Sequence, residues 1–163
     1  MRITLRLLAA VIMSMIMIDC APSDDPVKAR NIEVVHVVFS EIWSKGNVEL
    51  IHDVFADDFV GHFPAETVHG REGVLDRVTA HRTAFPDWTE EVEDTIVDRD
   101  QVVVRFTSRG TNLGEFLGKP PTRNRVEISE VAIFKLSDGK IVEQWVYPDI
   151  LSLQRQLGQQ EQQ

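Results

Sequence analysis

Asp149 stands where acid/base chemistry could be placed, directly behind the proline that ends an amphipathic strand. Pro148 cannot donate a hydrogen bond to a sheet and fixes its own φ, so the chain turns there. The Asp149 carboxylate then either caps the next segment or points into whatever the sheet encloses. Capping is the simpler role, because a short amphipathic helix ending at Gly158 follows and aspartate is a favoured N-cap. An acid/base role needs apolar pocket walls that raise the carboxyl pKa toward neutrality.

Four other residues could complete such a pocket. His62, on a short predicted strand, is the second candidate proton carrier, because an unperturbed imidazole titrates near neutral pH. Trp145 and Tyr147 share strand parity just before the proline, and with Phe85 they would supply apolar lining. The Tyr147 hydroxyl could bind a substrate oxygen, although half-exposed packing at a strand end is its alternative role.

Strand parity by itself selects Glu130. This residue lies between Ile128 and Ala132 on the more apolar face of a predicted strand, where an unpaired carboxylate is costly. Arg105, among the valines of its own strand, is the expected partner. A buried Arg–Glu pair would be structural rather than catalytic.

Two other kinds of site are not expected. The histidines are not spaced with acidic residues as a metal set, so we predict no metal. The segment 114–122 holds two glycines and two prolines but lacks the Gly-Lys-Ser/Thr ending of a phosphate-binding loop. We therefore expect a loop that flanks the pocket.

The spacing of apolar residues, which indicates the helices and strands that must position these residues, changes along the chain. The first part has helical spacing and the second alternates as strands do. This order predicts an α+β domain in which a curved antiparallel sheet packs on three N-terminal helices. The predicted helices cover 28–44, 48–55, 71–84 and 150–157, and the predicted strands cover 57–64, which we expect at a sheet edge, 89–97, 101–109, 125–136 and 140–147.

The N-terminal part resembles an export signal. Residues 1–19 carry Arg2 and Arg6 before a 12-residue apolar run, Leu7 to Ile18, which is too short to span a bilayer. Cys20 is then a lipidation candidate, although Asp19 departs from the small residues such sites prefer. A membrane-tethered lipoprotein, an uncleaved anchor and an ordinary secreted form stay open, all of them exported. We assign 20–27 to a tether, 28–158 to one domain and 159–163 to a disordered tail.

The amino-acid composition limits which partners and which covalent cross-links are expected. The net charge of −9 argues against nucleic-acid binding, because phosphate contacts need a basic patch. A single cysteine among 163 residues excludes an internal disulfide.

Several short motifs, taken in order, resemble one known family. They are His62 after Asp57-Asp58-Phe59-Val60, Gly70-Arg71-Glu72-Gly73-Val74, Ala84-Phe85-Pro86-Asp87, Arg105, Gly110-Thr111, the run from Gly114 to Thr122, Asp138-Gly139-Lys140-Ile141-Val142-Glu143-Gln144-Trp145, Asp149 and Gln156-Leu157-Gly158. Together they resemble the SnoaL-like polyketide cyclases, also called ester cyclases, of the nuclear-transport-factor-two-like superfamily. The resemblance covers about residues 29 to 158.

The resemblance implies a cone of curved sheet closed by three helices around a deep apolar pocket. It also implies that Asp149 acts as general acid/base in an intramolecular aldol ring closure, with no metal or cofactor. Two positions depart from the family pattern: Asn112 replaces a usual histidine and Arg123 a usual glycine. Asparagine can hydrogen-bond but cannot carry a proton at neutral pH, so fewer side chains near that loop can act as acid or base.

Three functions follow as expectations. The first is a cofactor-independent cyclase or isomerase acting on a hydrophobic carbonyl compound, with Asp149 and His62 catalytic and with Asn112, Arg105 and Glu130 among the substrate-binding residues beside the aromatic lining. The second is a non-catalytic module that binds a ligand and forms a homodimer through an exposed sheet face. The third is a hydrolase of the epoxide-hydrolase type, which needs Glu130 and Arg105 to point inward near Asp149.

Overall fold

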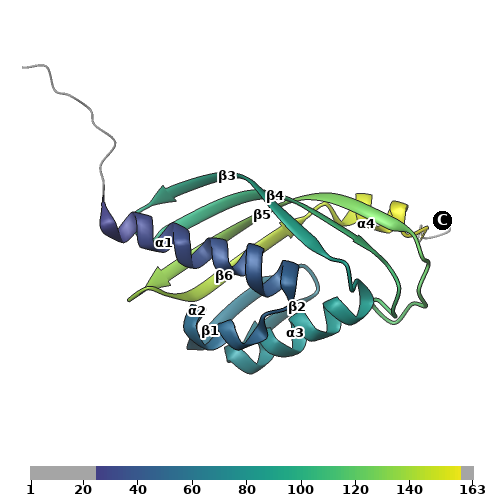
Figure 1. The fold of residues 1–163 in the computed structure, drawn as a ribbon, viewed down its shortest axis with the longest axis horizontal. Helices are drawn as coiled ribbons and strands as arrows, with labels where there is room; N and C mark the ends of the chain where they lie inside the picture. The colour runs from purple at the N-terminus through teal and green to yellow at the C-terminus, as the bar shows by residue number, and fades with distance from the viewer. Residues whose placement is uncertain (1–24, 159–163) are drawn as a thin grey trace, which may run out of the picture.

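One curved, unclosed sheet of six strands organises the computed structural model, which describes residues 25–158 (Figure 1). The strand order is β2-β1-β6-β5-β4-β3, and all neighbours are antiparallel except β1 and β6, which are parallel. The strands are β1 Phe55–Phe63, β2 Glu66–His69, β3 Thr89–Asp98, β4 Gln101–Thr111, β5 Arg125–Ser137 and β6 Lys140–Pro148.

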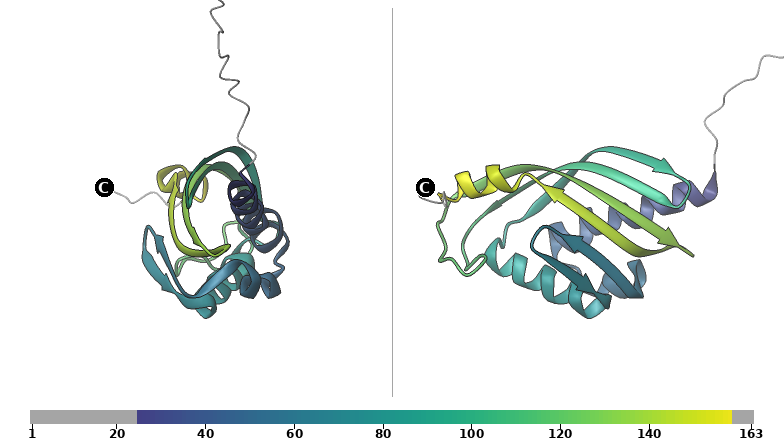
Figure 2. Two further views of the ribbon diagram at one scale, coloured as in Figure 1. Left: turned by 90° about the vertical axis from the view of Figure 1, so that its left-hand side faces the viewer. Right: turned by 180° about the vertical axis from the view of Figure 1, so that it is seen from behind.

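Helices fill the inner side of the curved sheet (Figure 2). They are α1 Pro26–Val37, which continues as the π-helical segment η1 Val38–Trp43, the 3-10 turn η2 Val48–Leu50, α2 Ile51–Val54 and α3 Gly70–Ala84. A further helix, α4 Ile150–Gln156, follows β6 at the C-terminal end. The predicted α+β class, with a curved sheet packed on three N-terminal helices, is therefore confirmed.

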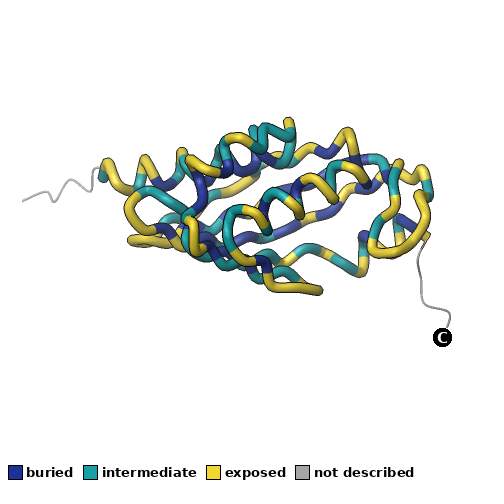
Figure 3. Tube along the Cα trace, turned by 90° about the horizontal axis from the view of Figure 1, so that it is seen from below, coloured by how far each residue is buried: buried dark blue, intermediate teal, exposed yellow. Residues whose placement is uncertain are grey.

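The core lies between these helices and the sheet, where buried residues face one another (Figure 3). Burial alternates along β5, so its even-numbered residues from Val126 to Leu136 face inward. This period of two is what a sheet with one covered face requires. Phe39 packs edge-on against Phe106 and Phe134, with ring centroids 4.7 Å and 5.7 Å apart.

The first strand differs most from its prediction. The expected edge strand at 57–64 is β1, and it lies inside the sheet between β2 and β6. The true edge, β2, is a short polar segment after the turn at Pro64 and Ala65, and it carries too little periodicity to be recognised. The parallel contact with β6 joins segments about 80 residues apart, so local sequence could not indicate it.

Besides the shift in the parallel pairing of β1 with β6, two register shifts change which side chains face inward. The pairing of β3 with β4 shifts between Val92 and Asp94, and that of β5 with β6 shifts between Lys135 and Leu136. Each bulge inserts one extra residue and moves the following side chains to the other face. In β6 this makes Ile141 and Gln144 both buried, across an odd separation.

Several predictions about the two ends of the chain fall outside the described residues. The signal segment, the Cys20 lipidation site and the C-terminal tail all lie there. Helix α1 begins at Pro26, before the predicted helix start at residue 28, and is capped by the Asp25 side chain. Within residues 25–158, none of the helices combines the length and apolarity needed to cross a bilayer.

Candidate functional site

A cavity lies between α3, η1 and the inner face of the sheet. Its inner part has a volume of about 70 Å³ and its outer part about 340 Å³. The two parts share six lining residues, which are Pro64, Arg77, His81, Trp88, Glu130 and Pro148.

The walls of the two parts differ in chemistry. The inner part combines aromatic rings with polar groups, including Glu90, Glu130 and Gln144. The π-helical segment η1 contributes Val38, Phe39 and Trp43 to it, and such segments frequently occur at functional sites. Most of the outer wall is apolar and comes from Ala65, Ala80, Phe116, Leu117, Ile128, Pro148, Ile150 and Leu153.

Glu130 is a carboxyl group that lines both parts of the cavity. It lies on β5 opposite Phe106 on one side and Pro148 on the other, and only 9% of its surface is exposed. Burial raises the pKa of Glu130 to about 7, because the charged form loses its water. The nearby Ser108 hydroxyl, although it makes no hydrogen bond of normal geometry, and the Arg77 charge offset part of this increase. Glu130 can therefore both accept and donate a proton near neutral pH.

Glu90 is a second carboxyl group in the inner part. Burial, and then the negative charge of Glu130, raise the pKa of Glu90 well above its ordinary value. A hydrogen bond from Trp88 Nε1 to Glu90 Oε1, at 3.1 Å, opposes the shift. Gly110 makes room for the Trp88 ring, because a Cβ at this glycine would lie 2.6 Å from a ring carbon.

Two basic side chains of α3 face the same space. Burial, followed by the charges of Arg77 and Arg82, lowers the pKa of His81 to about 3, so this imidazole is neutral. Arg77 forms an ion pair with Glu66 and lies 3.6 Å from the centre of the Phe63 ring. The cavity thus holds a neutral histidine and an arginine whose charge is already paired.

Three buried side-chain atoms within residues 25–158 lack a hydrogen-bond partner: Arg77 Nε, His81 Nε2 and Ser108 Oγ. Two belong to residues that line the cavity, and Ser108 lies beside Glu130 on the inner face. An unsatisfied buried polar atom costs about 1–3 kcal/mol. Their grouping around one cavity indicates where the polar atoms of a bound molecule would find partners.

Asp149 takes the capping role. Its Oδ1 accepts a hydrogen bond from the Ser152 backbone N–H at 2.9 Å, at the N-terminus of α4. The side chain is exposed, while the neighbouring residues Pro148 and Ile150 line the outer part of the cavity. The structure therefore places this carboxylate at the rim.

His62, Trp145 and Tyr147 lie on the outer face of the sheet, which corrects their predicted position in the pocket. His62 stacks on Trp145 with ring centroids 5.2 Å apart and hydrogen-bonds to Glu143 at 3.0 Å. Tyr147 is 60% exposed. The shared parity of Trp145 and Tyr147 was predicted correctly, but Gln144, Val146 and Pro148 are the β6 residues that face the cavity. The bulge near Val142 decides this.

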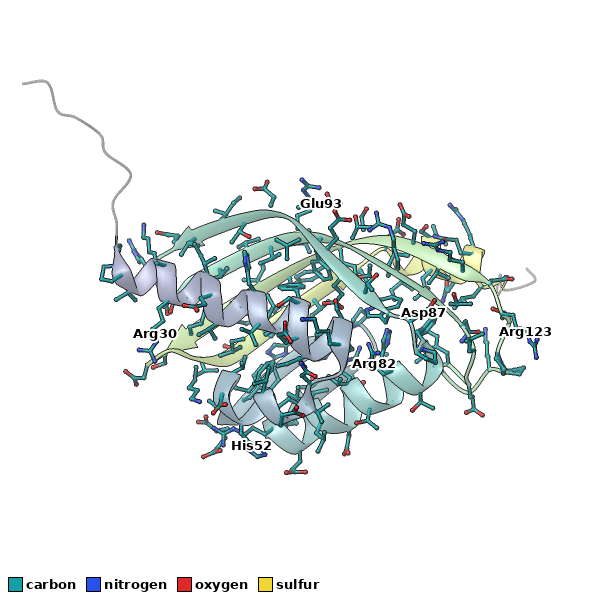
Figure 4. All side chains as sticks on the ribbon, in the orientation of Figure 1. Arg30, His52, Arg82, Asp87, Glu93 and Arg123 are labelled. Atoms are coloured by element: carbon teal, nitrogen blue, oxygen red, sulfur yellow. The ribbon has the colours of Figure 1, made fainter. Side chains whose placement is uncertain are left out.

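Arg105 and Glu130 do not form the expected pair. Arg105 lies opposite Val131 and is bonded to Glu93 on the outer side of β3, where Figure 4 shows Glu93. Glu130 lies opposite Phe106, so the two side chains face opposite sides of the sheet.

Asn112 and Phe85 have structural positions. Asn112 is fully buried, donates to the Gly114 carbonyl and accepts hydrogen bonds from the backbone N–H and hydroxyl of Thr122. It therefore fixes the loop that carries Phe116. Phe85 is fully buried behind the cavity wall, packed against Trp88 and Phe116.

Arg77, His81 and Glu90 are the site residues that sequence reasoning missed. A signal existed for the first two, because they share the inward stripe of α3 with the buried Val74 and Val78. The neighbouring Arg82 obscured that stripe, yet its guanidinium donates to the Trp43, Ser44 and Pro86 carbonyls and so joins α3 to η1 and to the turn before β3 (Figure 4). Glu90 gave no comparable signal, because the bulge in β3 breaks its alternation.

No cluster of three metal-ligating His, Cys, Asp or Glu side chains occurs within residues 25–158. The only potential ligands in the inner part of the cavity are Glu90, Glu130 and His81.

Comparison with known proteins places these features in a family. The model of the family described as SnoaL-like polyketide cyclase matches residues 33–157. A search of curated proteins returned no match.

Solved structures share the fold over most of the chain. A candidate SnoaL-like polyketide cyclase from Jannaschia sp. CCS1 is 27% identical, with a TM-score of 0.78 over 84% of this chain and 97% of its own. IdmH, a candidate polyketide cyclase from Streptomyces antibioticus, is 31% identical, with a TM-score of 0.69 over 78% of this chain and 98% of its own. AclR, a candidate hydroxylase from Streptomyces galilaeus, is 26% identical, with a TM-score of 0.72 over 82% and 98%.

Proposed function

This chain belongs to the SnoaL-like polyketide cyclase family, and from that premise we propose that it is a cofactor-independent cyclase or isomerase that moves a proton on a hydrophobic carbonyl compound. One observation carries the proposal: Glu130, a carboxyl group whose pKa is raised to about 7, lies in a cavity next to apolar walls. A general acid/base works best when its pKa lies near the operating pH.

The chemistry follows from the position of Glu130. Its carboxylate takes a proton from the carbon next to a carbonyl group, and the electron pair of the broken C–H bond forms an enolate. If the compound carries a second carbonyl, the enolate carbon attacks it and a ring closes. The proton held by Glu130 then passes to the new alkoxide, which restores the carboxylate. The net reaction is an isomerisation.

The outer part of the cavity supports a hydrophobic substrate. Its apolar lining would bind the body of the molecule, and its volume of about 340 Å³ is in the range of small-molecule sites. The carbonyl would then reach the polar inner part, where His81 Nε2 lacks a partner.

The family resemblance assigns the acid/base role to Asp149, whereas the geometry favours Glu130 for this chain. The Asp149 carboxylate is exposed and already accepts a hydrogen bond from the Ser152 backbone N–H, so it is used at the N-terminus of α4 rather than in the cavity. The hydrolase alternative is disfavoured, because it needs Arg105 to point inward and Arg105 is on the outer face.

The test uses 2-tetralone, a hydrophobic ketone with exchangeable α-protons, in deuterated water. Proton NMR measures the rate at which these protons exchange. We expect saturable exchange with the wild-type protein and a loss of at least about 100-fold in Glu130→Gln, the scale of a general base. Glu127→Gln is the matched control, because Glu127 is on the same strand but faces outward, paired with Arg109.

The outcomes separate three possibilities. Full exchange in Glu130→Gln together with loss in Asp149→Asn would assign the base to the rim and contradict our assignment. Saturable binding of 2-tetralone without any exchange would support the non-catalytic binding module instead.

A further inference from the structure

Glu90 and Glu130 lie on either side of one buried hydroxyl group. The pairing of β3 with β4 places Glu90 opposite Ser108. Ser108 is two residues from Phe106, which lies opposite Glu130 on β5. Each glutamate is therefore a direct or diagonal neighbour of Ser108, from the strand on one side of β4 or the other. Both carboxyl groups also line the inner part of the cavity.

The surrounding structure holds Glu90 in place. Trp88 Nε1 donates to Oε1 at 3.1 Å, and the Glu90 backbone N–H donates to Ser44 Oγ at 2.9 Å. The hydrogen bonds within residues 25–158 leave Oε2 of Glu90 free. This oxygen can therefore carry a proton toward the cavity.

The groups that face the two carboxyls do not neutralise both of them. From α3 come Arg77 and His81, and from β2 comes Glu66, which is already paired with Arg77. His81 is neutral, since its pKa is lowered to about 3 by burial and by nearby arginines. Two close carboxyl groups in a dry site cannot both ionise readily, so one proton stays on the pair.

We propose that Glu90 is a second catalytic residue, the general acid that works with Glu130 as general base on a neutral carbonyl compound. This inference rests on the function proposed above. As Glu130 takes the α-proton, the Glu90 hydroxyl gives its proton to the carbonyl oxygen, and a neutral enol forms instead of an enolate. When the enol carbon attacks the second carbonyl, the enol proton returns to Glu90 and the Glu130 proton goes to the new oxygen. Both carboxyls then regain their starting states.

The pH profile of 2-tetralone exchange tests this pair. The wild-type rate should rise as Glu130 loses its proton and fall at higher pH as Glu90 loses its own. Glu90→Gln keeps the acceptor for Trp88 Nε1 but cannot transfer a proton. We expect a rate about 100-fold lower, with 2-tetralone affinity changed by less than about twofold, and loss of the fall at high pH. An unchanged rate, or a high-pH fall that persists, would overturn the proposal.

A titration without substrate gives a second readout. Carboxyl carbon NMR of labelled glutamate follows the Glu90 pKa directly. In Glu130→Gln the neighbouring negative charge is gone, so the Glu90 pKa should fall, whereas Glu127→Gln should leave it unchanged. A Glu90 pKa that is the same in wild type and Glu130→Gln would refute the pair. Absence of exchange in the wild type would refute the proposed function itself, whereas exchange that survives in Glu90→Gln would refute only the role of Glu90.

Discussion

Glu127 and Glu130 lie three residues apart on β5 and face opposite sides of the sheet. Glu127 is exposed and paired with Arg109 at 2.9 Å, whereas Glu130 is buried beside a cavity. The histidines differ in the same way: His62 on the outer face is half-exposed and bonded to Glu143, while His81 on the inner side has a buried nitrogen without a partner. The same residue types thus occur on both faces. What distinguishes the inner face is loss of water combined with unused hydrogen-bonding capacity.

The largest effect is expected on the folding stability of Glu130→Gln, compared with that of Glu127→Gln on the same strand. The folded-state pKa of Glu130 is about 7, and its ordinary value is 4.5, which the unfolded chain should keep. Between these values the unfolded state holds fewer protons, so stability falls as pH rises from about 4.5 to about 7. Glu130→Gln lacks this loss. Over that pH range its free energy of unfolding should therefore rise by about 3 kcal/mol relative to wild type. Urea unfolding at several pH values measures it. Glu127→Gln should keep the wild-type pH dependence, and an equal change in both variants would contradict the contrast.

A second prediction compares two fully buried polar residues. Asn112 has partners for its amide, whereas Ser108 Oγ has none. Asn112→Ala should lower the free energy of unfolding by about 2 kcal/mol, because it leaves the Thr122 N–H and the Gly114 carbonyl without hydrogen-bond partners. Ser108→Ala removes an unsatisfied group and should cost less than about 0.5 kcal/mol. Thermal unfolding decides it, and a larger cost for Ser108→Ala would show that the hydroxyl is structural.

At the rim, Asp149→Ala should cost about 1 kcal/mol by removing the N-cap of α4. The rate of 2-tetralone exchange should stay within about threefold of wild type, since the cavity groups are intact. Asp149→Asn, which can still cap, should recover most of the stability. A rate loss in Asp149→Asn without loss of stability would instead make this residue catalytic.

The smallest effects are expected on the outer face. His62→Ala and Tyr147→Phe should each change the exchange rate by less than about twofold, because neither side chain reaches the cavity. Kinetics with 2-tetralone at neutral pH check this. If the exchange rate of His62→Ala no longer fell at one end of the pH range, the residue that transfers the proton would be on the outer face instead.

Local pattern was sufficient for much of the fold. Alternation placed the four long strands within a few residues of their ends, and helical spacing placed α3. Parity also turned Glu130 to the apolar face, as observed. Local pattern failed at β2 and at the two bulges, where pairing with a distant strand sets the register.

The sequence by itself determined the family, the α+β class and the inward direction of Glu130, because each depends on motifs or on the period of a single element. Only the tertiary structure decided that Asp149 caps a helix, that Trp145 and His62 lie outside, and that Glu90 joins Glu130 in the cavity. The physical reason is that a side chain's protonation and partners depend on water exclusion and on neighbours from other elements. Those neighbours meet only when β3, β5 and α3 pack together.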